Sequence, residues 1–177
     1  MKFLKYSSLL VIVILFSSTH ANTQEKKASK SNNKTLIQAA KEIMQNAKTC
    51  ALITVDDKGI ARVRTMDPFP PKENLIVWFG TNSNSRKVKQ IQENNNVTLY
   101  YEDPDKTGYV TIYGIATIVN DVTEKEKHWK TKWKDFYPNY PKDYTLIKVI
   151  PKWMEVVSET RGILGDTKTW KPQKVTF

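Results

Sequence analysis

Two basic segments near the middle of the chain carry the residues whose types and spacing could bind or transform a ligand. In the predicted strand Ile60–Met66, Arg62 and Arg64 lie two positions apart and therefore point to the same face of a sheet. Two guanidinium groups on one face repel each other unless an anion joins them, and their planar forks suit phosphate oxygens. On its own, the segment is more typical of an ordinary exposed, charged strand face.

The second segment, Gly80–Lys87, leads into a predicted short helix over Ser85–Glu93. Unpaired N–H groups and the positive end of the helix dipole make a helix start an anion site, and Arg86 and Lys87 add two positive charges. Alone, this segment also fits a capped surface helix. A cationic strand followed by a cationic helix start predicts a two-sided phosphate cradle.

The elements that position these residues follow from the apolar pattern. A helix is predicted from Thr35 onward, with Thr35 and Gln38 as a capping box, and a basic, tryptophan-bearing helix over Thr123–Phe136. Six strands are predicted, the last of them interrupted at Pro151: Cys50–Val55, Ile60–Met66, Leu75–Phe79, Val97–Glu102, Tyr109–Val119 and Asp143–Val157. Six short strands with few helices favour a mainly β (α+β) antiparallel barrel over a βαβ sheet.

The amino-terminal residues have the pattern of an export signal. Lys2 and Lys5 precede the apolar run Leu9–Phe16, and Thr-His-Ala ends at Ala21, which predicts a signal peptide over residues 1–21. Eight apolar residues are far fewer than the roughly 20 that a membrane span needs, although an uncleaved anchor is the alternative. The polar residues 22–33 are predicted to form a disordered tether. We therefore expect a secreted or periplasmic protein with no stable membrane insertion after cleavage.

Composition narrows the function classes further. The 177 residues carry a formal net charge of +10, one cysteine and two histidines. One cysteine excludes an intrachain disulfide, and after signal cleavage only His128 remains as a histidine ligand, so no metal site is predicted. The positive charge suits phosphorylated or acidic small molecules or membrane surfaces, and export argues against nucleic acid as a partner.

The order of the motifs resembles the pyridoxamine 5′-phosphate oxidase-like family of FMN-binding split β-barrels, in particular its general stress protein 26 branch. The resemblance is carried by Arg62-Val-Arg-Thr-Met66, the apolar strand after it, and Thr81-Asn-Ser-Asn-Ser-Arg-Lys87 opening a helix. It covers roughly Thr35 to Val157. It implies a six-stranded antiparallel split β-barrel with peripheral helices, an FMN-binding domain over residues 34–160, and a C-terminal extension over residues 161–177.

The resemblance also implies which residues contact FMN in a homodimer whose interface holds the flavin. The arginine strand would contact the phosphate and the edge of the flavin ring. The helix start would contact the phosphate, and two further strands would contact the flavin ring. The residues so implied are Arg62, Val63, Arg64, Thr65, Met66, Phe79, Gly80, Thr81, Ser85, Arg86, Lys87 and Tyr109. Gly80 departs from relatives, which often have tyrosine there. Trp129, Trp133 and Trp153 are candidates either for a contribution from the partner or for packing.

Two departures separate this chain from true pyridoxamine 5′-phosphate oxidases. Asp67 stands where those enzymes have a lysine, and a carboxylate repels a substrate phosphate. The segment Trp170–Phe177 has no Arg-x-His substrate motif. We therefore expect a flavin-dependent oxidoreductase acting on another small molecule, with no residue assigned as acid or base. The alternatives are a non-catalytic carrier of flavin, deazaflavin or haem, the last through His128, and a cationic adhesion domain without a cofactor.

Overall fold

The computed structural model describes residues 32–72 and 74–177. The compact unit that begins at Leu36 contains the sheet and the clefts described below. The predicted signal peptide and the tether up to residue 31 lie outside the described residues, whereas residues 32 and 33 are already helical. No helix in the described part is long and apolar enough to cross a membrane.

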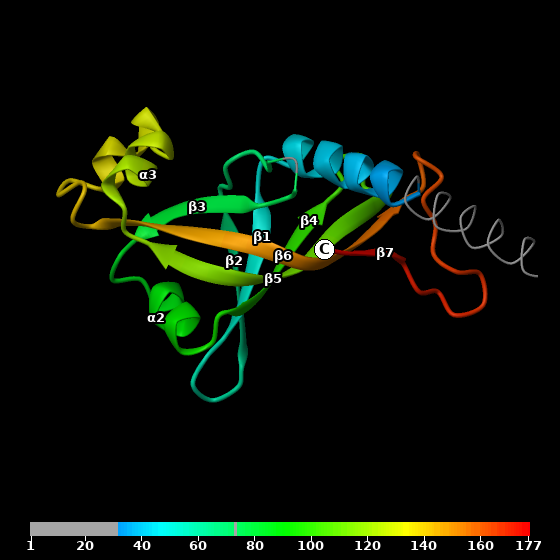
Figure 1. The fold of residues 1–177 in the computed structure, drawn as a ribbon, viewed down its shortest axis with the longest axis horizontal. Helices are drawn as coiled ribbons and strands as arrows, with labels where there is room; N and C mark the ends of the chain where they lie inside the picture. Colours follow the sequence, from blue (N-terminus) through cyan, green and yellow to red (C-terminus); the bar gives the residue numbers. More distant parts are fainter. Residues whose placement is uncertain (1–31, 73) are drawn as a thin grey trace, which may run out of the picture. The chain divides into compact units, whose positions relative to one another are not determined.

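A single antiparallel sheet contains all six predicted strands and one more. The sheet runs in the order β2-β1-β4-β5-β6-β3, with β7 added beside β6, so that β2 and β3 are left unpaired with each other (Figure 1). This open arrangement confirms the prediction of an antiparallel split barrel. The strands are β1 (Cys50–Val55), β2 (Ala61–Met66), β3 (Val77–Asn82), β4 (Asn96–Glu102), β5 (Gly108–Val119), β6 (Tyr144–Ser158) and β7 (Gln173–Thr176). The seventh strand, β7, comes from the predicted C-terminal extension.

The predicted interruption of the last strand at Pro151 is wrong. Strand β6 continues through Pro151, which pairs with Gly114 of β5. The register shifts just beyond this pair, because Tyr113 faces Trp153 and leaves Lys152 as an extra residue. A bulge of this kind lets a strand accept a proline, which has no N–H to give to the ladder.

The helices differ from the sequence predictions in two places. The single helix predicted over Thr123–Phe136 is wrong, since the chain forms α3 (Val122–Lys127) and then a 3-10 helix, η1 (Thr131–Phe136). Between them, Lys130 is extended at φ −112° and ψ 120°. The first helix includes residues 32–46, so Thr35 is not its cap, and Gln38 instead donates to Glu42. The short helix α2 (Arg86–Glu93) forms as predicted, with Ser85 at its N-cap.

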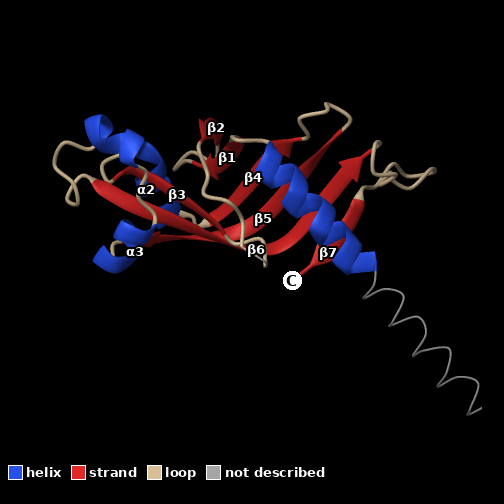
Figure 2. Ribbon diagram, turned by 90° about the horizontal axis from the view of Figure 1, so that it is seen from above, coloured by secondary structure: helices blue, strands red, loops and turns tan. Residues whose placement is uncertain are grey.

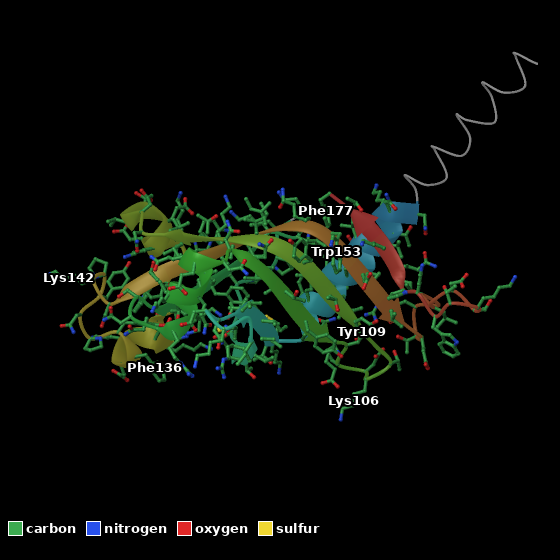
Figure 3. The ribbon with its side chains drawn as sticks, turned by 90° about the horizontal axis from the view of Figure 1, so that it is seen from below. Lys106, Tyr109, Phe136, Lys142, Trp153 and Phe177 are labelled. Atoms are coloured by element: carbon green, nitrogen blue, oxygen red, sulfur yellow. The ribbon has the colours of Figure 1, made fainter. Side chains whose placement is uncertain are left out.

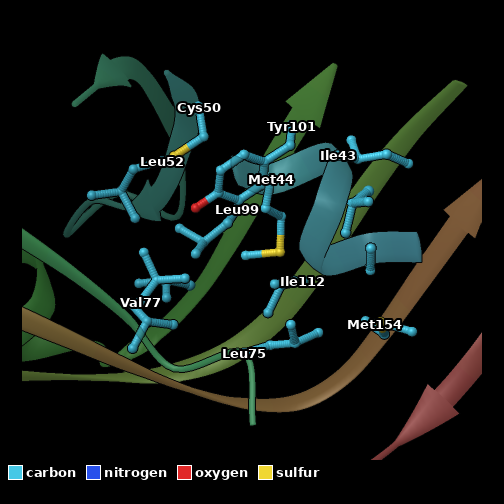
Figure 4. Close-up of a cluster of buried hydrophobic side chains, with 14 of the residues drawn as sticks. Ile43, Met44, Cys50, Leu52, Leu75, Val77, Leu99, Tyr101, Ile112 and Met154 are labelled. Atoms are coloured by element: carbon cyan, nitrogen blue, oxygen red, sulfur yellow. The ribbon is translucent and has the colours of Figure 1, made fainter. Parts of the chain in front are cut away.

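The main core lies between the first helix and one face of the sheet (Figure 2). Figure 4 shows Ile43 and Met44 of the helix meeting side chains of several strands, among them Leu99 and Ile112. Burying each such side chain contributes about 1.5–3 kcal/mol. This layer holds β1 through Leu52, and β1 in turn positions β2, the strand that carries Arg62 and Arg64, because the two strands pair along their whole length.

Candidate functional site

A cleft of about 400 Å³ opens where four separate parts of the chain meet. The end of β2 and the end of β3 form its floor, the start of α2 closes one side, and η1 with the residue after it closes the other. Its lining residues are Thr65, Met66, Asp67, Gly80, Thr81, Asn82, Ser85, Lys87, Trp133, Phe136 and Tyr137. One side is polar and cationic and the other is aromatic, so the cleft suits a ligand with an anionic end and a ring.

Hydroxyl groups and an ammonium group meet at the polar side of the cleft. Lys87 Nζ donates to Thr81 Oγ1 at 2.8 Å, and Ser85 Oγ lies 3.4 Å from the same oxygen. The Ser85 side chain does not cap α2, and the first turn of this helix holds no acidic residue. The helix start therefore presents N–H groups and two hydroxyls to the same space, as an anion site requires.

Arg64 is held in place beside this side of the cleft by neutral partners. Its guanidinium donates to Thr54 Oγ1 at 2.7 Å and to Gln90 Oε1 at 3.1 Å. Thr54 is fully buried and itself donates to Gln90, so the network is rigid. Partial burial, with the charges of Arg86 and Arg62, lowers the pKa of Arg64.

The positive charges gathered here lack nearby counter-charges. No carboxylate of the described residues lies within 4 Å of the charged nitrogens of Arg64, Arg86 or Lys87. Partial burial and the charge of Arg64 lower the pKa of Lys87. Neighbouring positive charges lower one another's pKa, and an anion bound among them would stabilise their charged forms.

The aromatic side of the cleft depends on a glycine. A Cβ on Gly80 would lie 2.6 Å from Trp133 Cζ3 and would overlap the ring of the fully buried Tyr144. Trp133 and Tyr144 belong to a second cluster of buried aromatic side chains, separate from the main core. The space beside Gly80 on β3 is therefore filled by the ring of Trp133 from η1 and the ring of Tyr144 from β6.

Asp67 is neutralised by two lysines from the segment around η1. Lys130 Nζ lies 2.6 Å and Lys132 Nζ 3.0 Å from its carboxylate oxygens. Lys130 also donates to Pro68 O at 3.1 Å and sits over the rings of Phe69 and Trp133. These contacts fasten the aromatic side of the cleft to the end of β2. The two lysine charges reduce the repulsion that the carboxylate of Asp67 would exert on a phosphate.

We expect Asp67→Asn to lower the free energy of unfolding by about 1 kcal/mol at neutral pH, a value typical of half-exposed ion pairs. Partial burial alone would raise the pKa of Asp67, but the hydrogen bonds from both lysines outweigh it and hold the pKa below 3.8. A lowered pKa stabilises the fold above the unfolded value, and this stabilisation is lost as the pH falls through the folded value. Urea unfolding between neutral pH and pH about 3 should therefore show the two proteins converging in acid. Asp57→Asn, at an exposed carboxylate without an ion pair among the described residues, should show no such convergence.

Residues 35–166 match the family described as Pyridoxamine 5′-phosphate oxidase like. The chain belongs to this family. The match covers most of the sheet and the whole cleft, and it confirms the resemblance drawn from the two motifs. No curated protein is a significant match.

Solved structures of similar fold include two general stress proteins. General Stress Protein 26 from Bacillus anthracis aligns over 80% of this chain and 98% of its own, with 24% identity and a TM-score of 0.63. A protein related to general stress protein 26 from Clostridium acetobutylicum aligns over 81% and 96%, with 20% identity and a TM-score of 0.67. An F420 reductase aligns over 64% and 94%, with 23% identity and a TM-score of 0.53. At these identities the likeness shows the pyridoxamine 5′-phosphate oxidase-like fold.

Six of the twelve residues implied by the family resemblance line the cleft. They are Thr65, Met66, Gly80, Thr81, Ser85 and Lys87. Arg64 lies beside them, as its electrostatic effect on Lys87 shows. Arg62 and Arg86 instead line a neighbouring hollow of about 240 Å³, where Arg62 pairs with Asp56 at 2.7 Å.

The remaining three residues lie elsewhere in the chain. Phe79 is fully buried in the main core, and Val63 is 65% exposed on the opposite face of β2 from Arg62 and Arg64. Tyr109 pairs with Val157 near one end of β6, whereas Thr81 pairs with Thr145 near the other, roughly 40 Å away along the strand. Figure 3 shows Tyr109 well apart from Phe136 at the cleft. The flavin contact of Tyr109 stays a prediction.

Sequence reasoning missed the side chains that close the aromatic side. Phe136 and Tyr137 line the cleft, and Phe136 is 73% exposed there. The many aromatic residues around η1 were a signal in the sequence. The single long helix predicted there did not indicate that their rings lie beside β3. His128, considered as a haem ligand, is buried and stacked on Trp78 with ring centroids 4.3 Å apart.

Proposed function

We propose that this protein is an exported, homodimeric FMN-binding member of the pyridoxamine 5′-phosphate oxidase-like family that transfers electrons to or from a small molecule. The observation that carries the proposal is a group of cations, Arg64, Arg86 and Lys87, beside hydroxyls in a cleft with an aromatic side. None of the three has a carboxylate partner in the part of the chain that the structure describes. The F420 reductase of similar fold supports a flavin-like cofactor, since its name describes a deazaflavin enzyme. A deazaflavin is the second candidate cofactor for this reason.

The residues of the cleft fit FMN at both ends. Lys87 and the hydroxyls of Thr81 and Ser85 would bind the phosphate, with Arg64 and Arg86 adding positive charge. Met66 and Phe136 would flank the ring system and exclude water from it. Bound FMN would supply the hydride or electron transfer, and the chain would supply binding and orientation.

The homodimer is supported by an apolar face of the sheet. One row across the strands, on the face opposite the first helix, is apolar or aromatic except at Thr98 of β4; it consists of Val63, Ile53, Thr98, Tyr113 and Trp153. Tyr113 stacks on Trp153 at 5.4 Å between ring centroids, and Val63 is 65% exposed. The other members of the row are half-buried, and apolar side chains partly exposed on a sheet face are typical of protein interfaces. Tyr109 lies on the same face, so a dimer formed here would bring it into an interface, where the resemblance puts flavin contacts.

We expect Val63→Glu combined with Tyr113→Glu to convert the dimer to a monomer, because each protomer would bury two new carboxylates against apolar partners. Sedimentation velocity measures the result. Leu164→Glu, which alters a side chain of similar exposure away from this row, should leave the dimer intact. A wild-type chain that sediments as a monomer at every concentration would overturn this part of the proposal.

Reconstitution with FMN tests the proposed function as a whole. The purified chain should bind FMN stoichiometrically, show flavin absorbance after gel filtration, and lose that absorbance when a reduced nicotinamide is added. Binding without reduction by any donor would favour the carrier alternative. A colourless protein that binds neither FMN nor a deazaflavin would leave the cationic adhesion domain.

A further inference from the structure

Gln90 is a polar residue on the buried side of α2. Its neighbours on that side, Val88 and Ile91, are hydrophobic, and Gln90 itself is only 9% exposed. It contacts Thr54 of β1, which is fully buried. Burying two polar side chains costs free energy unless both are hydrogen-bonded, so an apolar pair would be the simpler way to pack α2 against β1. The third member of this network, Arg64, gives a reason for the polar pair.

The three side chains form a closed ring of hydrogen bonds. Thr54 Oγ1 donates to Gln90 Oε1 at 2.7 Å and accepts from Arg64 Nη1 at 2.7 Å, while Arg64 Nη2 donates to the same Gln90 oxygen at 3.1 Å. Because a guanidinium can only donate, the amide oxygen of Gln90 and not its nitrogen has to face Arg64. The ring uses two of the five N–H bonds of Arg64, and the other three have no partner in the described part of the chain.

The two acceptors that hold Arg64 carry no charge. A half-buried arginine is commonly paired with a carboxylate, which fixes the guanidinium but also neutralises it. The hydroxyl of Thr54 and the amide of Gln90 fix the guanidinium and leave its charge free to act on a ligand. Burial and the charge of Arg64 lower the pKa of Lys87, so this charge reaches the polar side of the cleft.

We propose that Gln90 and Thr54 are positioning residues for Arg64, and that their neutrality makes the cleft select a flavin with a phosphate over one without. This inference rests on the proposed binding of FMN. A guanidinium held in place before the ligand arrives does not lose its rotamer freedom on binding, so more of the attraction appears as affinity. Gln90→Glu would hold Arg64 equally firmly, but the new carboxylate would compete with the phosphate for the guanidinium.

Gln90→Glu separates this role from a structural one, because it keeps the shape of the side chain. The dissociation constant for FMN should rise about tenfold, while that for riboflavin, which has no phosphate, should stay within about twofold. The ligand-free variant should unfold at the same or a higher temperature, because the carboxylate forms an ion pair with Arg64. A structural role would instead weaken both flavins together with the fold. Gln92→Glu adds the same charge at an exposed position of α2 and should leave both affinities within about twofold.

A pair of variants at Thr54 tests the positioning without adding a charge. Thr54→Val removes the hydroxyl at nearly constant volume and should weaken FMN about fivefold, whereas Thr54→Ser keeps the hydroxyl and should stay within about twofold of wild type. If Gln90→Glu does not fold, this pair decides, and equal FMN affinities of the two variants would overturn the proposal.

Fluorescence titration with FMN and with riboflavin measures these affinities. The proposal is wrong if Gln90→Glu binds FMN as tightly as the wild type does, or if it loses affinity for FMN and riboflavin equally. A wild-type chain that binds FMN no more tightly than riboflavin would refute the phosphate cradle itself, and one that binds neither would refute the proposed function. These results separate a failure of the positioning role from a failure of the site on which it depends.

Discussion

Replacing Arg86 and Lys87 together with alanine is expected to weaken FMN binding by roughly one to three orders of magnitude. The charge-assisted hydrogen bond from Lys87 contributes about 1.5–3 kcal/mol, and losing the nearby positive charge of Arg86 adds up to about 1 kcal/mol. Because Arg64, Arg86 and Lys87 repel one another, removing two of these charges should not destabilise the protein without ligand. Fluorescence titration measures the dissociation constant, and thermal unfolding checks the fold.

Two controls make this expectation specific to the phosphate. Riboflavin, which has no phosphate, should bind the double variant and the wild type equally. Lys89→Ala should leave FMN binding unchanged, because Lys89 is strongly exposed on α2 and faces Glu93. A dissociation constant for FMN that does not change in the double variant would refute the phosphate cradle.

Gly80→Ala is expected to lower the free energy of unfolding by about 1–3 kcal/mol, the usual range for a methyl group forced into a packed site. The added Cβ would lie 2.6 Å from Trp133 and would overlap Tyr144, which is fully buried. Displacing Trp133 alters the aromatic side of the cleft, so FMN affinity should fall as well. Urea unfolding followed by tryptophan emission measures both the stability and the change around Trp133.

The comparison with Gly59→Ala separates crowding from backbone strain. Gly59 has φ +76°, and no atom lies within 4 Å of the position that an added methyl group would take, so alanine there costs about 1 kcal/mol through its backbone alone. It should leave tryptophan emission unchanged. Trp133→Leu in the Gly80→Ala background should recover part of the stability lost at residue 80, and a further loss instead would show that the contact with Trp133 is not the cause.

The sequence by itself determined the local features of this protein. The alternation of side chains along a strand predicted that Arg62 and Arg64 share one face. In the structure Arg62 lies opposite Thr54 and Arg64 opposite Leu52, two buried residues of β1. The start of α2 at Ser85 was equally predictable, because capping and turn preferences act over a few residues. All six predicted strands are present for the same reason, since a period of two is a property of neighbouring residues. Their bounds were less predictable, because β3 runs over Val77–Asn82 and not Leu75–Phe79, and β6 continues through Pro151.

Only the tertiary structure decided what surrounds the cationic side of the cleft. Lys130 reaches Asp67 across 63 positions of the chain, and Trp133 fills the space that Gly80 leaves open. The helix predicted over Thr123–Phe136 breaks because its aromatic residues are better buried against β3 and β6 than spread along one helix. Such long-range packing leaves no periodic mark in the sequence, so the aromatic side of the cleft could be found only in the folded chain.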